Sequence, residues 1–414
     1  MSVNSTNKRK IINDPVYGFI NIPGDLLYDL IEHPYFQRLR RIKQLGLTHL
    51  VYPGALHTRF HHSIGAMHLM QQAISVLKAK GNIITAKEEE AACIAILLHD
   101  IGHGPFSHAL EHSIVKSINH EAISEILMQQ LNEQFIGKLA LAIEIFNKTY
   151  HKNFLSQLVS SQLDMDRLDY LKRDSFFTGV SEGVIGTERL IKMLDVEDDE
   201  LVVEAKGIYS LEKFIVARRI MYWQVYLHKT VLAAENMLMH VLERAAYIAK
   251  RGEQLFATPA LLYFLKSDFS KSDIRQNPQV LRNYTLLDDF DIFTAIKVWC
   301  THEDKILSIL SKKLVNRNLF RCEVQLEPFE YFYIEEIREK IVSKYELKEE
   351  YLKYFFYTDT TSNYAYNLDS DKINIRLKNG KILDVVEASD QLDISILSKI
   401  VTKHYICYPK DVDN

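Results

Sequence analysis

Residues 91–98, AACIAILL, are apolar on every side of a helix and lead directly into HDIGHGPFSHALEH. A helix without a polar face lies in a protein core, so this stretch predicts a mainly helical fold. His99 and Asp100 then stand at the end of a buried helix, where an unpaired carboxylate costs free energy. Neighbouring side chains diverge by about 100° within a helix, but Gly102 and Gly104 interrupt it and let the pair converge. A metal ion would supply the missing partner.

The hydrophobic pattern is helical from residue 24 to about 315. One helix is expected to end near Gly81, and a second, with an acidic first turn, leads to His99. Residues 211–252 predict one very long helix, or two end to end, stopping at Gly252. Residues 195–207, DVEDDELVVEAKG, give the only β signal in the first three hundred residues and predict a small hairpin.

The pattern changes after about Phe320. Residues 321–329 and 373–387 alternate as strands do, and Asn379-Gly380 predicts a hairpin with a type I′ turn. Residues 389–408 predict a helix followed by a last strand. We therefore expect a mainly α protein with a helical core over residues 1–320, metal motifs within 50–175, and a small α+β C-terminal module over 321–414 that packs on the core.

Composition narrows the class of function. The net charge is −4 over 414 residues, so an anionic substrate must be attracted by local cations or by a metal. The polar start MSVNSTNKRK has no secretory character, and the apolar run before His99 is too short to cross a bilayer. The four cysteines lie far apart without a CxxC pair, which favours a reducing cytoplasm and argues against a zinc ribbon.

A first source of further ligands is HTRFHHSIG, residues 57–65. It offers three histidines, His57, His61 and His62, at a helix start. His61 and His62 point in different directions, so only one of them is expected to ligate. Arg59 shares a face with His62, because i and i+3 are neighbours on a helix, and would place a guanidinium beside the metal.

A second source is SSQLDMDRLDYLKRD, residues 160–174. Asp166, Asp169 and Tyr170 share one face of the predicted helix, whereas Asp164 lies roughly 200° from Asp166 and faces away. The alternative for this segment is a solvated helix in which Asp169 and Arg173 form an i, i+4 pair.

The order RFHHS … HDIGHGPFSH … DMDRLDY resembles the HD-domain metal phosphohydrolases. It is most similar to the branch of deoxynucleoside triphosphate triphosphohydrolases that includes the SAM-and-HD-domain dNTPases and bacterial dGTPase-like enzymes. INDPVYGFI, FQRLRRIKQLG and YPGALHTRFHHSIGAMHL resemble the same branch in the same order. The resemblance covers roughly residues 10 to 250, includes no SAM domain, and implies an HD-domain helical bundle.

The resemblance implies a role for each matching position. The metal ligands fall on His62, His99, Asp100 and Asp166, which decides between the two adjacent histidines. His61 stands where the family usually has Glu. The catalytic residues fall on His103, His108, His120 and Glu111, the last in a place where close dNTPases have Asp. His112 is not among them.

Further positions match parts of the family that bind nucleotide. Substrate contacts fall on Gln44, Leu45, Arg59, Arg167, Tyr170, Asp174, Arg218 and Tyr226. A regulatory nucleotide region is matched at Lys10, Asn13, Asp14, Gln37 and Arg40, with Glu32 where relatives have Asp. The alternative for RLRRIKQ is an ordinary solvated basic helix face.

The expected activity is metal-dependent hydrolysis of a deoxynucleoside triphosphate to the deoxynucleoside and inorganic triphosphate. A mixed N/O site suits one divalent ion, Mn, Fe, Ni, Zn or Mg, and a second ion can accompany the substrate. The expected partners are a nucleotide and further copies in a dimer or tetramer, with no membrane and no indicated nucleic acid.

Two other functions remain open at this point. One is an HD-type phosphodiesterase or phosphomonoesterase acting on a nucleotide monophosphate, a cyclic nucleotide or an alarmone. The other is a non-catalytic module that binds nucleotide or single-stranded nucleic acid. Single-strand binding would need a basic groove with exposed aromatics.

Overall fold

The structure is a computed structural model that describes residues 10–106, 119–367, 372–390 and 398–413. Helices dominate, as the sequence predicts. The first half contains β1 (Ile11–Asp14), β2 (Gly18–Asn21), α1 (Asp25–Glu32), α2 (Pro34–Gln37), α3 (Arg59–Ala79), α4 (Ala86–Leu98), α5 (His120–Gln134), α6 (Ala140–Phe146), α7 (Asn153–Val159), α8 (Met165–Thr178) and α9 (Thr187–Met193).

The second half contains β3 (Leu194–Glu197), β4 (Glu200–Glu204), α10 (Ile208–Met221), α11 (Lys229–Lys250), α12 (Pro259–Lys266), α13 (Lys271–Gln276), α14 (Pro278–Leu286), α15 (Asp289–Trp299) and α16 (Lys305–Val315). The C-terminal part adds β5 (Arg321–Gln325), α17 (Tyr331–Tyr345), β6 (Tyr357–Asn363), β7 (Asn374–Arg376), β8 (Ile382–Asp384), α18 (Val385–Ala388) and β9 (Val401–Tyr408).

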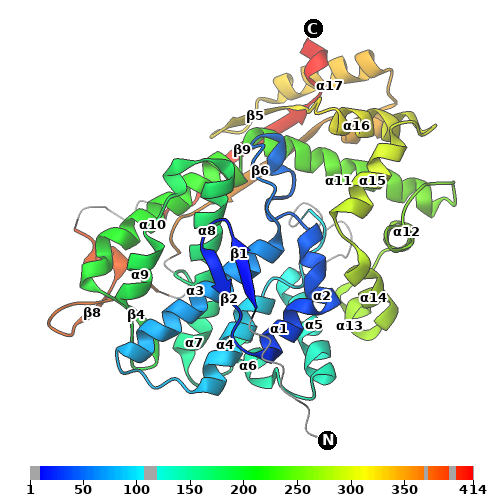
Figure 1. Ribbon diagram of the computed structural model, residues 1–414. Helices are drawn as coiled ribbons and strands as arrows, with labels where there is room; N and C mark the ends of the chain where they lie inside the picture. Colours follow the sequence, from blue (N-terminus) through cyan, green and yellow to red (C-terminus); the bar gives the residue numbers. More distant parts are fainter. Residues whose placement is uncertain (1–9, 107–118, 368–371, 391–397, 414) are drawn as a thin grey trace, which may run out of the picture.

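The helix α4 lies at the centre of the bundle, as its sequence predicts. Every side chain from Ala91 to Leu98 is buried, and α3, α6 and α7 pack around it. The neighbouring helix α3 also packs against α8, so the three segments that carry the predicted metal ligands meet in the core. Figure 1 shows these helices side by side below β5, β6 and β9.

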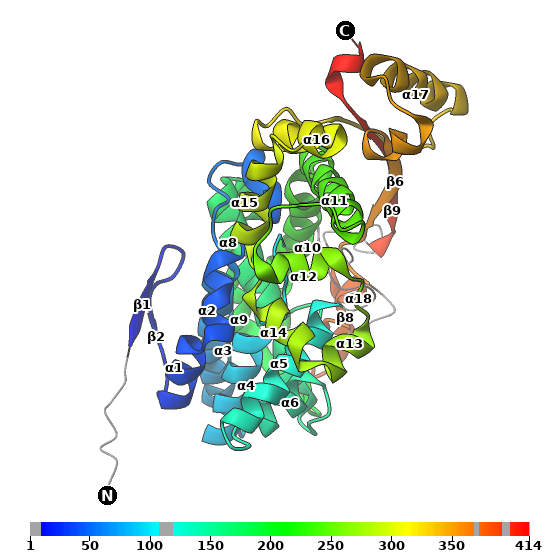
Figure 2. The same cartoon turned by 90° about the vertical axis from the view of Figure 1, so that its right-hand side faces the viewer.

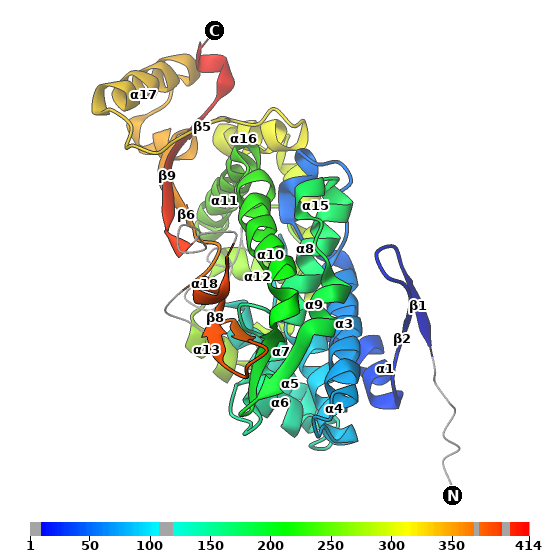
Figure 3. The same cartoon turned by 90° about the vertical axis from the view of Figure 1, so that its left-hand side faces the viewer.

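Two predictions about the helices are confirmed. The helix α3 ends at Ala79, and Gly81 follows with a φ of +96°, which only glycine adopts easily. Residues 211–252 form two helices end to end, because a π-helical turn over Tyr222–Tyr226 separates α10 from α11. Figure 3 shows α10 running along the length of the molecule, with α11 near its upper end.

The hairpin predicted over residues 195–207 is confirmed as the antiparallel pair β3–β4. It is not the only hairpin in the first three hundred residues, so that expectation is wrong. The strands β1 and β2 form a second hairpin, and Gly18, the first residue after the turn, has φ +74°. Strands of four residues are too short to show alternation in the sequence. Figure 2 shows this hairpin standing at one side of the helical body.

The C-terminal strands divide between two sheets. The strands β5, β9 and β6 form an antiparallel sheet, whereas β7 pairs in parallel with β4, giving the order β3-β4-β7-β8. A hairpin does join β7 and β8, but the predicted type I′ turn is wrong. Only Gly380 has a positive φ, +83°, and its amide donates to the carbonyl of Leu377. This geometry is a type I turn followed by a left-handed glycine.

The division at residue 320 stays a prediction, because strands from both sides of it share the sheet β3-β4-β7-β8. The last strand is confirmed as β9, and the helix expected before it falls on residues 391–397, outside the described residues. No helix in the described part of the chain combines the length and the apolar character that crossing a bilayer requires.

Candidate metal centre

Three helix ends bring the predicted metal ligands together. His62 lies in the first turn of α3, and His99 is the C-cap of α4, directly followed by Asp100. Asp166 lies in the first turn of α8, whose N-cap is Asp164. The carboxylate of Asp164 accepts hydrogen bonds from the backbone amides of Ser161 and Arg167. Asp164 therefore fixes the helix start and leaves Asp166 as the carboxylate directed at the histidines.

The four ligand side chains converge on one point. Nε2 of His62 lies 3.1 Å from Oδ1 of Asp166 and 3.7 Å from Oδ2 of Asp100. Nε2 of His99 lies 3.3 Å from Oδ1 of Asp100 and 3.5 Å from Oδ1 of Asp166. Two imidazole nitrogens and two carboxylates within this space are a donor set typical of a divalent metal.

The second ring nitrogen of each histidine is held by a hydrogen bond. Nδ1 of His62 donates to Oδ2 of Asp169 at 2.8 Å, and Nδ1 of His99 donates to the carbonyl of Ile96 at 2.6 Å. These bonds leave each Nε2 with its lone pair directed into the cluster, where it is buried and has no hydrogen-bond partner. Metal-binding histidines are held in this way, so the residues present fit a metal ion.

Electrostatics favour a positive charge between the carboxylates. Burial alone would lower the pKa of His62, but the nearby carboxylates of Asp166 and Asp169 raise it to about 10. Burial would raise the pKa of Asp166, yet His62 and His99 hold it far below its usual range. The imidazoles therefore carry protons that a divalent cation can replace.

The alternative for residues 160–174, a solvated helix with an i, i+4 ion pair, is confirmed for the ion pair and wrong for the solvation. Asp169 and Arg173 do form an i, i+4 pair, with Nε and Nη2 of Arg173 at 2.9 and 3.0 Å from the carboxylate. Both side chains are completely buried rather than solvated. Besides pairing with Arg173, Asp169 accepts a hydrogen bond from His62 and so supports a metal ligand.

The predicted catalytic histidines lie beside the cluster. Nε2 of His103 is 3.2 Å from Oδ1 of Asp100, and its ring stacks on that of His120 with centroids 3.7 Å apart. This approach requires Gly102, whose added Cβ would lie 2.3 Å from the carbonyl oxygen of His120. His108 and Glu111 fall on residues 107–118, outside the described residues.

Asp100, His103 and His120 also form a group close enough to be considered for a second ion. The stacked rings argue against it, because a metal must lie in the plane of each imidazole that binds it. Two nearly parallel rings 3.7 Å apart cannot share an ion in that way. Burial and the positive charge of Arg59 keep the pKa of His103 well below its usual value, which suits a residue that accepts a proton.

Tyrosines and arginines extend the site along α8 and α10. The rings of Tyr170 and Tyr226 lie 6.1 Å apart, and Tyr222 lies 5.1 Å from Tyr226. The guanidinium of Arg218 stands 6.0 Å from the centre of the Tyr222 ring. Arg167, next to Asp166, donates to the carbonyl of Ser161 at 2.6 Å. The ring of Tyr170 lies 6.5 Å from that of His62, so the tyrosines adjoin the metal cluster.

Arg218 is a buried guanidinium with few hydrogen-bond partners. It is 7% exposed, its Nη1 donates to the carbonyl of Ala365 at 3.3 Å, and its Nε has no partner. It forms no ion pair with a carboxylate in the part of the chain that the structure describes. A buried cation without a counterion indicates a place for an anionic ligand.

A polar network lies at the other end of this surface. Asp174 accepts hydrogen bonds from the hydroxyl of Tyr226 at 2.8 Å and from Nε2 of His57 at 2.7 Å. The carbonyl of His57 accepts from the amide of Gln44 at 3.0 Å, and Leu45 follows. Arg59 donates to Asp100, so it lies at the metal cluster as predicted from its helical spacing with His62.

Sequence reasoning missed several residues of this site. His57 is predicted only as a possible ligand and Arg173 only as part of a surface pair, whereas Asp169 is placed on the ligand face but not as a support for His62. Tyr222 was not considered, although Arg218, Tyr222 and Tyr226 repeat every four residues and so mark one helix face. That spacing was the signal that could have found Tyr222.

The predicted regulatory residues lie on the N-terminal segment, away from the metal cluster. Lys10, Asn13 and Arg40 are exposed, and Gln37 accepts a hydrogen bond from Arg40 at 2.8 Å. Asp14 is different, because it is 3% exposed and paired with Arg173. Its carboxylate is directed into the protein toward Arg173, and its role toward a regulatory nucleotide stays a prediction.

Two parts of the chain match known family models. Residues 59–174 match the HD domain, and residues 185–257 match the HD associated region. The first match begins and ends on residues of the site, Arg59 and Asp174.

Several curated proteins are similar to this chain. The uncharacterized protein YwfO of Bacillus subtilis is 33% identical over 98% of this chain and 93% of its own length. The deoxynucleoside triphosphate triphosphohydrolase SAMHD1 homolog of Dictyostelium discoideum is 33% identical over 61% of this chain and 52% of its own. Human SAMHD1, also named as a deoxynucleoside triphosphate triphosphohydrolase, is 30% identical over 77% and 55%.

Solved structures agree with the fold. A phosphohydrolase from Bacteroides thetaiotaomicron is 55% identical, covers 97% of this chain with all of its own, and superposes with a TM-score of 0.94. A hypothetical protein from Aquifex aeolicus is 27% identical, with 98% of this chain and 97% of its own covered and a TM-score of 0.74.

Proposed function

This chain belongs to the HD-domain family of phosphohydrolases, and from that premise we propose that it hydrolyses deoxynucleoside triphosphates to the deoxynucleoside and inorganic triphosphate. The names of the similar SAMHD1 proteins support this substrate class. One water is consumed, the bond between the α-phosphorus and the 5′-oxygen breaks, and the 5′-oxygen takes up a proton.

The observation that carries the proposal is the buried Arg218 beside a ready metal-ligand set. Its free Nε and lack of a carboxylate partner leave one positive charge for an anionic ligand. Arg167, whose Nε lies 3.3 Å from Oδ2 of Asp164, adds a second guanidinium next to Asp166. A triphosphate needs several such charges, and guanidinium groups suit phosphate oxygens because they can donate two hydrogen bonds at once.

A divalent ion held by His62, His99, Asp100 and Asp166 would polarise a phosphoryl oxygen and lower the pKa of a bound water. Arg59 holds the Asp100 carboxylate in place on one side. Among the described imidazoles, His103 could accept the proton that the attacking water loses, because its pKa is lowered, and His120, stacked on it, could pass a proton to the leaving 5′-oxygen. The predicted His108 and Glu111 would act in the same step.

The ribose and base are assigned to the tyrosine end of the surface. The hydroxyl of Tyr226 and both oxygens of Asp174 are already hydrogen bonded, so this part of the site is held in shape before a ligand binds. A tyrosine ring packed under the ribose would leave no room for a 2′-hydroxyl. Equal turnover of GTP and dGTP by the purified protein would contradict this preference.

The decisive test is product identity. Metal-loaded protein is incubated with each dNTP, alone and in mixtures, and products are separated by ion exchange and identified by phosphorus NMR. Deoxynucleoside with inorganic triphosphate supports the proposal. Monophosphate or pyrophosphate products would instead indicate a phosphodiesterase or phosphomonoesterase, and binding without turnover would indicate a non-catalytic module. His99→Ala, which removes a ligand, is the inactive control.

Oligomerisation and activation by a second nucleotide are part of the same proposal. Lys10, Asn13, Gln37 and Arg40 are the candidates for a regulatory contact, in a dimer or tetramer. A lag in the progress curve, abolished by a second nucleotide, is expected. Linear rates without activation would remove the regulatory role and leave the hydrolysis unaffected.

A further inference from the structure

A buried chain of alternating charges joins the N-terminal hairpin to the metal ligand His62. His62 donates from Nδ1 to Asp169 at 2.8 Å, and Asp169 accepts two hydrogen bonds from Arg173. Nη1 of Arg173 then donates to Oδ2 of Asp14 at 2.7 Å. None of these four side chains is more than 3% exposed, so water does not screen their interactions.

The last member of the chain is fixed by the hairpin turn. The second oxygen of Asp14, Oδ1, accepts the backbone amides of Val16 and Tyr17 at 2.9 and 3.0 Å. The ring of Tyr17 lies 5.5 Å from the guanidinium of Arg173. The position of the Asp14 carboxylate therefore depends on the conformation of β1–β2, which lies outside the matched HD domain.

Helix α3 is shaped to receive this ion pair. Gly65 lies one turn after His62, and a Cβ added there would come within 2.1 Å of both Nη2 of Arg173 and Oδ1 of Asp169. The pair is therefore in close contact with the backbone of the helix that carries the ligand. A shift of Arg173 would be transmitted to His62 through Asp169 and through the α3 backbone.

We infer that the N-terminal hairpin is part of the metal centre, with Asp14 as a positioning residue that acts on His62 through Arg173 and Asp169. Asp14 neutralises Arg173, which leaves the negative charge of Asp169 available to orient His62 and to strengthen its Nε2 as a ligand. The inference rests on the metal-dependent function proposed above. It assigns Asp14 a structural link to the ion and not a contact with a nucleotide.

The link works in both directions. Because the hairpin and the ion hold the same chain of side chains, an ion that binds more tightly when the hairpin is docked also stabilises the docked hairpin. Metal binding is therefore expected to reduce local opening of β1–β2, although no residue of the hairpin is a ligand.

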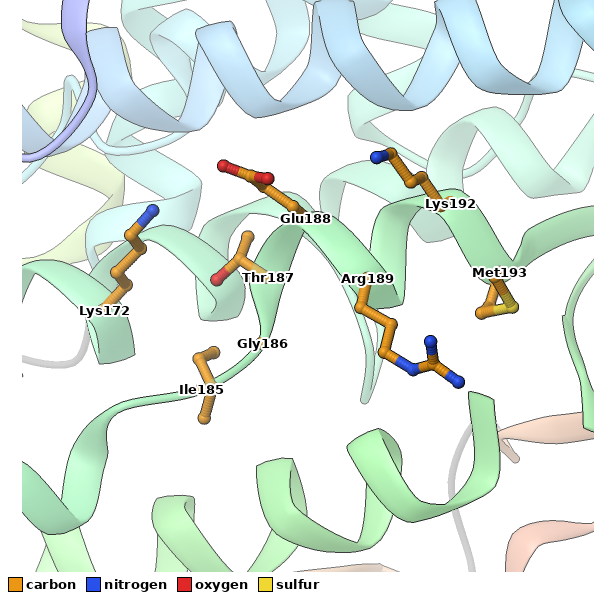
Figure 4. A pocket seen from close by; sticks show the side chains of 8 residues that line it. All are labelled: Lys172, Ile185, Gly186, Thr187, Glu188, Arg189, Lys192 and Met193. Carbon is orange, nitrogen blue, oxygen red and sulfur yellow. The ribbon is translucent and has the colours of Figure 1, made fainter. Parts of the chain in front are cut away.

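The residue before Arg173 provides a matched control. Nζ of Lys172 lies 4.5 Å from the ring centre of Tyr17, so it also contacts the hairpin. Its side chain, however, lines an open pocket of about 420 Å³ together with Glu188 and Lys192, as Figure 4 shows. Lys172 thus carries the same charge toward the same hairpin without joining the chain to His62.

The test measures Mn²⁺ binding to the metal-free full-length protein by calorimetry, without substrate. Asp14→Asn is expected to weaken Mn²⁺ binding about tenfold, the low end of effects measured for residues behind a ligand. Lys172→Gln is expected to bind as the wild type does, and His62→Ala to lose binding. An Asp14→Asn affinity equal to the wild type, or an equal loss in Lys172→Gln, overturns the inference. Unchanged binding in His62→Ala would instead overturn the proposed metal centre.

Hydrogen exchange supplies a second readout that needs no substitution. Mn²⁺ is expected to slow amide exchange in residues 11–21 of the wild type, and this slowing should disappear in Asp14→Asn while remaining in Lys172→Gln. Exchange in the wild-type hairpin that does not respond to Mn²⁺, under conditions where calorimetry shows binding, overturns the inference even if Asp14→Asn does not fold.

Discussion

Arg218 illustrates how one side chain can lower stability and serve a site. Its guanidinium is buried beside Tyr222, donates to the backbone carbonyl of Ala365 and has an unpartnered Nε. Burying a cation without a counterion costs free energy, and a bound phosphate would recover it through charge-assisted hydrogen bonds. The residue is therefore expected to matter for ligand binding more than for folding.

Arg218→Gln is accordingly predicted to reduce kcat/KM for dNTP by roughly 10- to 150-fold, the equivalent of losing one hydrogen bond to a charged group. Thermal stability should stay equal or rise, because the unpaired charge is removed. Arg244→Gln is the matched control: Arg244 is buried too but pairs with Asp304, so it should lose stability and keep its kinetics. Equal destabilisation of both variants would contradict this interpretation.

Gly65 is a second residue whose role is steric. In a helix interior alanine is usually better than glycine by about 1 kcal/mol. At Gly65 the added Cβ would overlap Arg173 and Asp169, so Gly65→Ala is predicted to destabilise the protein by about 1–3 kcal/mol. It should also weaken metal binding through His62. Urea unfolding checks the first effect, and Ser75→Ala, at an exposed position of α3, should show no loss.

The helix α4 depends on a charged N-terminal cap. Thr85 and Glu88 form a capping box, and Glu88 also pairs with Lys152 at 2.8 Å. Burial would raise the pKa of Glu88, but hydrogen bonds from Lys152, Tyr150 and Thr85 lower it to about 2. A lowered carboxylate pKa gives stability above the unfolded value of about 4.3, and this stability is lost as the pH falls toward 2.

Glu88→Gln is therefore predicted to lower the free energy of unfolding at pH 7 by on the order of 2 kcal/mol. The difference from the wild type should shrink as the pH falls from about 4.3 toward about 2, because the wild-type carboxylate is then protonated as well. Urea unfolding at pH 7, 4 and 3 measures this. A difference that stays constant with pH would show that the cap does not depend on the charge.

The ends of helices and the positions of hairpins could be predicted where residues close together in the sequence determine them. The apolar stretch before His99, the glycine after α3 and the hairpin at Asn379-Gly380 each depend on residues close in sequence. The hairpin β1–β2 was not predicted, because its inner residues Ile12 and Ile20 become a buried face only once α3 lies behind them. The parallel pairing of β4 with β7 joins residues far apart in the chain, and no local pattern predicts it.

At the scale of the whole molecule, the metal centre is expected to contribute to stability. Three segments meet at the ligands, and without an ion their carboxylates depend on protonated histidines. An ion at 100 times its Kd would stabilise the folded state by about 2.7 kcal/mol, by mass action alone. Treatment with EDTA should therefore lower the Tm by a few degrees, and added Mn²⁺ should restore it.

The control for this prediction is His62→Ala, whose Tm should not respond to either treatment. A wild-type Tm that is the same with EDTA and with Mn²⁺ would contradict a metal bound at this site. Calcium added in place of Mn²⁺ should restore less, because two imidazole ligands suit transition metals better than a hard cation that prefers oxygen.

The sequence by itself determined which side chains can bind a metal and on which helix ends they lie. The His-Asp pair after a buried helix follows from residue types and their place in the helix, whereas the choice of His62 over His61 and of Asp166 follows from the family resemblance. The tertiary structure decided what surrounds them. Asp169 and Arg173 have the same i, i+4 spacing whether water or protein covers them, and only the packing of β1–β2 and α3 makes their pair buried. Asp14, Arg218 and Tyr222 likewise acquire their surroundings from segments distant in sequence, because burial depends on what covers a side chain and not on its neighbours in the chain.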